Sequence, residues 1–282
     1  MNCVSWVVLT CTLAALAGCR PDADSPPAQG VGTPITFATP TDPNHRAFIY
    51  GVRLRVSVIE VPVGTASDSE QLWSYLDEER TRSLRWTSLG RNGLRVGVTG
   101  DDSWEQVVKV LQKLTGRKMK EQLVLAQAGV PLPIELKTNQ PASTVFTGFH
   151  DGTLSGSDYP AGDYLLTVTC TLDENDPNNF IVSALPQIRP THRTARYVPT
   201  DEGISMVLQP AMFSFQPAMF QLRMTGREVL IIGPGSDARR PSSIAHHFLM
   251  HDKDQVEFES VLVLVPELIK AELTDVALPR GT

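Results

Sequence analysis

Apolar and polar residues alternate along several stretches of this sequence, which is the pattern of a β-strand with one buried face. The clearest case is 164–172, in which every second residue is apolar and threonine fills the positions between from Thr167 on. A second apolar run, Phe180-Ile181-Val182, follows a loop rich in Asp and Asn over 173–179. Because alternating runs on either side of a polar loop pair readily, these residues predict an antiparallel hairpin.

The same reading predicts further strands. They cover 52–58, 94–98, 204–208, 220–224, 228–232 and 255–265. The last of them is apolar on both faces in its latter half. A strand with two apolar faces is covered on both sides, so we expect it to be central in its sheet.

Helical spacing is confined to the first half of the chain. Leu72, Trp73 and Leu76 predict a short helix over 69–79, and apolar residues at i, i+3, i+4 and i+7 predict a second over 102–114. Asp102 and Glu105 have the spacing of a capping box at its start. The expected fold is α+β, mostly antiparallel β with two short helices in the N-terminal third. We divide it into a small α+β unit over 45–117, a β-rich domain over 118–270 and a tail over 271–282.

The chain begins with an apolar run, Val4 to Ala17, that is shorter than the ~20 residues of a membrane-spanning helix. It ends in Leu16-Ala17-Gly18-Cys19, which resembles the lipobox of bacterial lipoproteins. The resemblance implies cleavage after Gly18, so that 1–18 is a signal peptide and Cys19 carries the lipid. No Lys or Arg precedes the run, and an ordinary secretory signal or a retained anchor is the alternative.

Acyl chains on Cys19 would hold the protein at a bacterial membrane, because each buried methylene contributes about 0.8 kcal/mol. Residues 19–44 are rich in Pro, Gly, Thr, Ser and Asp and predict a flexible tether. We therefore expect a location in the cell envelope, facing the periplasm or the cell surface. The net charge of −6 argues against nucleic acid as a partner.

Two residue types outside the signal could carry chemistry. Cys170 is the only thiol left after lipidation, and in its strand pattern it is either a nucleophile or, as we prefer, a small buried hydrophobe. His247 and His251 would share one face of a helix and are candidates for zinc or iron. The glutamate of an H-E-x-x-H motif is absent, and a polar turn is the alternative interpretation.

Three loop segments resemble ligand sites only superficially. The run 173–179 lacks the spacing of a calcium loop and favours a turn. Gly233-Pro234-Gly235 lacks the lysine of a phosphate loop, and Ser155 lies outside any G-x-S-x-G elbow. We therefore predict no catalytic residue, no cofactor and no enzymatic activity.

The order of these elements resembles the C-terminal domain of the secretins, which build outer-membrane export pores. The matching segments are short apolar patterns over Leu54–Val61, the helix 102–114 followed by 122–136, Gly162–Thr169 and Glu259–Ile269. The family's Val-Pro-Xaa-Leu-Gly gate has no counterpart between Gly233 and Asp254, and its membrane lip is not evident in Lys270–Thr282. The resemblance implies a secretin-like domain in which sheets continue between subunits.

These observations favour a non-enzymatic envelope lipoprotein that serves in a secretion or pilus-type machine, with strand pairing between copies or with an envelope partner. A lipoprotein that binds a small ligand or glycan is the second class, and a deep pocket would favour it. A metal-dependent enzyme built on His247 and His251 is the third.

Overall fold

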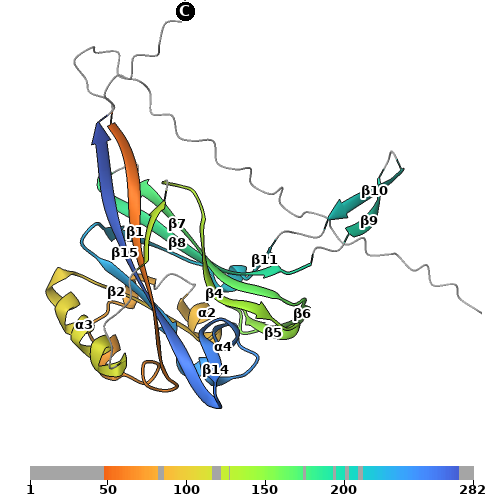
Figure 1. Ribbon diagram of the computed structural model, residues 1–282, viewed down its shortest axis with the longest axis horizontal. Helices are drawn as coiled ribbons and strands as arrows, with labels where there is room; N and C mark the ends of the chain where they lie inside the picture. Colours follow the sequence, from red (N-terminus) through yellow and green to blue (C-terminus); the bar gives the residue numbers. More distant parts are fainter. Residues whose placement is uncertain are drawn as a thin grey trace, which may run out of the picture. The chain divides into compact units, whose positions relative to one another are not determined.

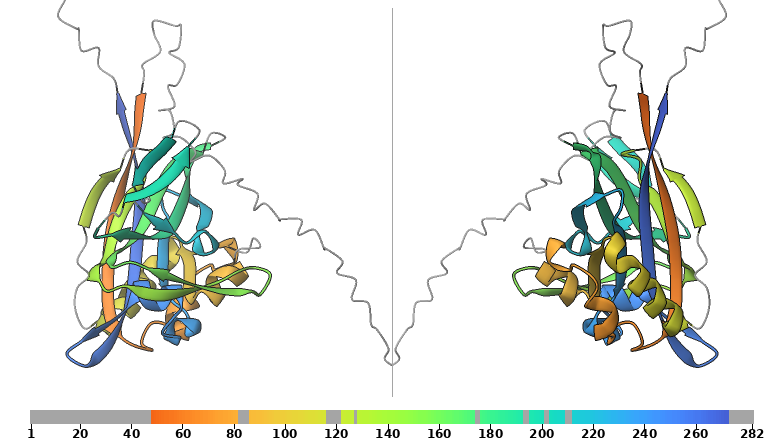
Figure 2. Two further views of the ribbon diagram at one scale, coloured as in Figure 1. Left: turned by 90° about the vertical axis from the view of Figure 1, so that its right-hand side faces the viewer. Right: turned by 90° about the vertical axis from the view of Figure 1, so that its left-hand side faces the viewer.

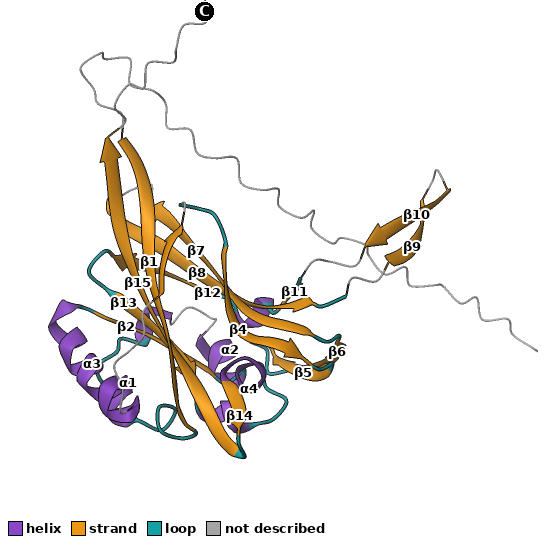
Figure 3. Cartoon of the chain, in the orientation of Figure 1, coloured by secondary structure: helices purple, strands orange, loops and turns teal. Residues whose placement is uncertain are grey.

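A computed structural model describes residues 48–81, 86–115, 122–126, 128–173, 176–192, 195–200, 203–208 and 212–272. Antiparallel strands dominate these residues, and the few helices are short segments between them (Figure 3). The expectation of a mostly antiparallel β fold is confirmed. The signal peptide, the tether with Cys19, and the tail from 273 lie outside the described residues.

The larger sheet joins strands from both ends of the chain. Its order is β2-β13-β15-β1-β3, with β14 also paired to β15. The bounds are β1 Phe48–Pro62, β2 Leu94–Thr99, β3 Gln122–Ala126, β13 Val229–Pro234, β14 Met250–Lys253 and β15 Val256–Glu272. β1 and β15 run side by side over their whole lengths (Figure 1). The ranges 45–117 and 118–270 thus contribute strands to one sheet, and β15 is central, as its two apolar faces predict.

The smaller sheet has the order β11-β8-β7-β4, with β12 also paired to β8. Its strands are β4 Leu132–Gln140, β7 Gly162–Asp173, β8 Asp176–Pro190, β11 Phe213–Ser214 and β12 Phe220–Thr225. β7 and β8 form the hairpin expected from the alternating pattern, with Cys170 opposite Val182 and Leu172 opposite Phe180. Two further pairs form separate hairpins: β5 Ser143–Gly148 with β6 Leu154–Tyr159, and β9 Ala195–Thr200 with β10 Gly203–Leu208.

Two apolar clusters cover opposite faces of the larger sheet. In the first, Leu54 and Leu264 share a buried cluster with Val168 of β7 and with residues of β8, so the two sheets pack face to face. In the second, Val107 and Leu111 of α3 (Asp101–Thr115) share a buried cluster with Val263 of β15. Figure 2 shows α3, in yellow, beside β1. The resulting order of layers is helix, sheet, sheet.

The helices differ in detail from their sequence pattern. The other α-helices are α1 Glu70–Trp73, α2 Trp86–Arg91 and α4 Ile244–Leu249, and η1 Glu79–Thr81, η2 Gln216–Ala218 and η3 Ser236–Arg239 are 3-10 turns. The helix predicted over 69–79 ends early because Asp77 exchanges backbone hydrogen bonds with Val98 of β2. α3 begins at Asp101, with the Gly100 carbonyl accepting from the Trp104 amide, so Asp102 lies in its first turn and does not cap it.

Candidate functional site

The histidines of the metal hypothesis are held by different partners. His247 lies in α4, and its Nε2 is 3.2 Å from the Thr144 carbonyl of β5. His251 lies beyond the helix in β14, and its Nε2 is 2.7 Å from Ser260 Oγ. Because α4 ends at Leu249, the two residues do not share a helix face. Among the described residues, no group of three or more His, Cys, Asp or Glu side chains is arranged to hold a metal ion.

Lys137 of β4 reaches the same segment from the smaller sheet. Its ammonium group donates to the carbonyls of His246, at 3.3 Å, and of Met250, at the C-terminal end of α4. A cation is favourable there because the last carbonyls of a helix carry partial negative charge. Burial nevertheless lowers the pKa of Lys137 to about 8, against the opposing attraction of Asp252.

Cys170 lies on the buried face of β7, within the cluster between the sheets. Burial raises the pKa of its thiol to about 11. A nucleophilic cysteine requires the thiolate, which this environment disfavours at neutral pH. The position therefore fits the small buried hydrophobe that the alternating pattern predicts.

The loop segments use their polar groups internally. Asp176 accepts hydrogen bonds from the Asn178 amide and from Asn179, as expected of a turn, and Asp173 pairs with Arg223 at 2.8 Å. Gly233 and Pro234 belong to β13, where they pair with β2. Ser155 is exposed in β6.

The β9–β10 hairpin carries an exposed apolar pair that the sequence analysis did not single out. Tyr197 and Met206 are directly opposite each other in the register and are 70% and 59% exposed. Among the described strands, β9 and β10 pair only with each other. The signal in the sequence is weak, because each strand has only six residues.

Glu259 is fully buried at the start of the apolar half of β15. Its carboxylate accepts hydrogen bonds from the backbone amides of Gly64, at 3.2 Å, of Ala66, and of Ser67, at 2.9 Å. Trp73 Nε1 donates to the Ala66 carbonyl at 2.9 Å. The loop between β1 and α1 is therefore fixed from both sides.

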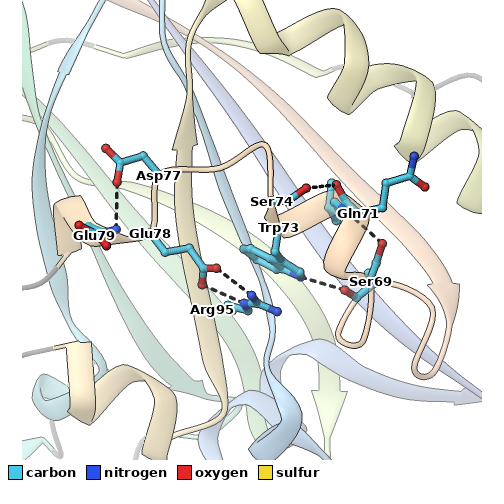
Figure 4. Close-up of polar contacts among 10 residues, drawn as sticks. Ser69, Gln71, Trp73, Ser74, Asp77, Glu78, Glu79 and Arg95 are labelled. Atoms are coloured by element: carbon cyan, nitrogen blue, oxygen red, sulfur yellow. Dashed lines mark hydrogen bonds and ion pairs between the residues drawn. The ribbon is translucent and has the colours of Figure 1, made fainter.

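Beside this loop, Arg95 of β2 is held in one orientation (Figure 4). Its Nε and Nη2 each donate to Glu78 at 2.8 Å, in a bidentate pair. The guanidinium carbon lies 4.5 Å from the centre of the Trp73 ring. Ion pairing and stacking together leave the arginine little freedom.

Comparison with known proteins gives little further information. A scan against protein-family models and a search of curated proteins both find no match. One solved structure to which the chain is similar is described as the InvG secretin domain beta-barrel from the Salmonella SPI-1 injectisome NC-base. The identity is 11%, the TM-score is 0.14, and the match covers 83% of this chain and 64% of that one.

None of the helices in the described part of the chain is long and apolar enough to cross a bilayer.

Proposed function

We propose that this protein is a non-enzymatic, lipid-anchored component of the bacterial cell envelope that pairs its strands with other protein chains. Its secretin-like, β-rich domain would serve in the assembly of a secretion or pilus-type system. The observation that carries the proposal is the β9–β10 hairpin, whose exposed Tyr197 and Met206 form one apolar patch.

Among the described strands, the β9–β10 hairpin is a two-stranded sheet with no third strand beside it. A two-stranded hairpin is marginally stable in water, and a third strand or a packed partner normally completes it. Aromatic side chains contribute much of the contact area at protein interfaces, while their exposure in a free chain brings no benefit. A strand from a second copy, or from an envelope partner, would cover the patch and satisfy the outer edges of β9 and β10.

The proposed anchor places the domain where such partners are. Acyl chains on Cys19 would retain it at a membrane, and a tether over 19–44 would allow it to reach proteins near the surface. Mass spectrometry of the mature N-terminus tests this part directly. Cys19→Ser should release the chain from the membrane fraction, and retention of this variant would contradict the anchor.

Photocrosslinking tests the interface. A benzophenone amino acid replaces Tyr197 in the full chain, in cells that express it from its own locus, and adducts are identified by mass spectrometry. We expect a defined adduct with a second copy or with one envelope protein. The control carries the same group at Val256, which is 48% exposed on β15. Equal labelling at the two positions would contradict the proposal.

A polar double variant tests the energetic role of the patch. With the benzophenone group at Ala195, an exposed position of β9, the otherwise unchanged chain should form the same adduct, and Tyr197→Ser combined with Met206→Ser should abolish it and leave the fold intact, since both side chains are exposed. Leu154→Ser changes an apolar residue that is 57% exposed on the other hairpin, at β6, and serves as the matched control. An adduct that persists in the double variant, or is lost in the control, would argue against this surface.

A further inference from the structure

The β5–β6 hairpin has one strand that is exposed almost along its whole length. Each residue of β6 from Leu154 to Asp158 is exposed, and only Tyr159, at the end of the strand, is half-buried. β5, by contrast, lies beside α4 (Figure 1), and its Phe146 amide donates to the Ser242 carbonyl at 2.8 Å. Among the described strands β6 pairs only with β5, so its other edge is free.

The hydrogen bonds of β5 show which backbone groups of β6 point to this free edge. The amides of Phe146 and Gly148 donate to partners outside the hairpin, at 2.8 Å in each case, and so point away from β6. These residues are opposite Gly156 and Leu154 in the register, and both pairs are therefore of the kind that exchanges no hydrogen bonds. Alternate residues of a strand direct their backbone groups to opposite sides. Leu154, Gly156 and Asp158 thus present their N–H and C=O groups to the free edge.

β6 also lacks the features that block further pairing at an exposed edge. Lysine, proline and β-bulges are the usual ones. The edge strand β4 of the smaller sheet has Pro133 and two shifts of register against β7. β6 contains neither lysine nor proline, and its register with β5 is uninterrupted from end to end. Its edge is therefore open to an added strand, which is a recurring way of binding an extended peptide.

The side chains on the same face of β6 indicate which peptide would fit. Leu154 is 57% exposed, and the Phe146 ring lies over Gly156, where an added Cβ atom would be 2.9 Å from it. Residues added beside Leu154 and Gly156 would therefore contact apolar groups. Asp158 accepts a hydrogen bond from Thr144 but forms no ion pair with any residue that the structure describes. A basic residue beside Asp158 would supply the opposite charge.

We infer that the free edge of β6 binds an extended segment of another protein, with one basic and two apolar residues at alternate positions. The segment is antiparallel to β6, since parallel pairing is less stable per residue. Its basic residue comes first and lies opposite Asp158, and the apolar residues lie opposite Gly156 and Leu154. Each of the three pairs would contribute two backbone hydrogen bonds. This edge is separate from the β9–β10 hairpin, and neither proposal depends on the other.

Fluorescence anisotropy of a labelled peptide, titrated with the full chain, tests the inference. The probe is Lys-Thr-Val-Thr-Val with both ends capped, in which the lysine and the two valines pair with β6. N-methylation of the first valine removes a donor to the Gly156 carbonyl and should weaken binding about tenfold. N-methylation of the second threonine removes a donor that points away from β6 and should have little effect. Equal losses with the two methylated peptides would contradict strand addition.

Reversal of one charge assigns the binding to β6. Asp158→Lys should weaken binding of the probe about threefold, because an exposed ion pair contributes about this factor. The same variant should bind Glu-Thr-Val-Thr-Val more tightly than the wild type does. Glu257→Lys reverses a charge at an exposed position of β15 and should leave both affinities unchanged.

Three other results would overturn the inference. They are a probe that does not bind, tighter binding of the reversed peptide Val-Thr-Val-Thr-Lys, and affinities that do not respond to Asp158→Lys. Sedimentation of the full chain tests the remaining occupant. A dimer that excludes the probe and dissociates in the Asp158→Lys variant would show that a second copy covers the edge, and would equally overturn the inference.

Discussion

Glu259 is the residue whose loss we expect to be most damaging. Its buried carboxylate accepts three backbone amides from the β1–α1 loop, and each buried donor left unpaired costs about 1–3 kcal/mol. Glu259→Ala should therefore lower the free energy of unfolding by at least about 3 kcal/mol. Urea unfolding of the full chain, followed by tryptophan fluorescence, measures the change.

The matched control for this prediction lies two residues earlier on β15. Glu257→Ala removes the same charge from an exposed side chain and should change the stability by less than about 0.5 kcal/mol. Glu259→Gln keeps an acceptor oxygen and should fall between the two variants. Similar midpoints for Glu259→Ala and Glu257→Ala would show that the loop does not depend on this carboxylate.

Lys137 should make stability depend on pH in the alkaline range. Its pKa falls from 10.5 to about 8 in the folded protein because burial disfavours the ammonium form. Between these values the unfolded chain binds the additional proton, so the stability rises as the pH increases from 8 to 10.5. The full difference corresponds to roughly 3 kcal/mol.

The measurement compares wild type with Lys137→Met by urea unfolding at pH 8 and pH 10. The wild type should gain stability relative to the variant as the pH rises, since methionine has no proton to lose. Lys113→Met removes one charge at an exposed position of α3 and controls for the change in net charge. Parallel pH curves for wild type and Lys137→Met would contradict the prediction.

At the residue scale, the burial of a side chain could be predicted where it follows from local alternation. Hydrogen bonds to residues far away in the chain could not. Cys170 could be placed in the core because its neighbours alternate along one strand. The hydrogen bond between the Ser67 amide and the Glu259 carboxylate could not be predicted. It forms because β15 packs beside a loop that lies about 190 residues away in the chain.

At the scale of elements, the strands were predictable and the helix ends were not. The β7–β8 hairpin follows from a period of two over a long run, which specifies both the strand and its buried face. The helix over 69–79 ends at Trp73 because Asp77 pairs with β2. Tertiary pairing of this kind overrides helical spacing and leaves no mark in the local sequence.

The β9–β10 hairpin should be the least stable described element of the free chain. Each of its strands has a single described neighbour, whereas β7 pairs on both sides. Amide hydrogen exchange in the purified chain should therefore be fast over 195–208 and slow over 162–173. Assembly with the proposed partner should slow exchange in the hairpin. Strong protection in the monomeric chain would show that the hairpin is already complete without one.

At the scale of the whole molecule, the pairing of β1 with β15 determines the fold. These strands lie at opposite ends of the described chain, and their full-length register joins segments that the sequence suggested as separate units. Local patterns identify both strands but cannot identify partners. Long-range pairing of this kind also predicts slow folding, because the chain entropy of closing the loop is lost before the contacts form.

The folded molecule should also lose stability in mild acid, through the histidines around α4. Burial, together with the charges of His246 and Lys137, lowers the pKa of His247 from 6.5 to about 4, and the pKa values of His246 and His251 are lowered as well. The unfolded chain takes up these protons first as the pH falls, so stability is lost between pH 6.5 and 4. Of the three, His247 has the largest shift and should contribute most to this loss. His247→Gln keeps a donor for the Thr144 carbonyl but cannot be protonated, so its unfolding midpoint should fall less steeply over this range. The same steepness in both proteins, measured by thermal unfolding at pH 4, 5, 6 and 7, would refute a contribution from this histidine.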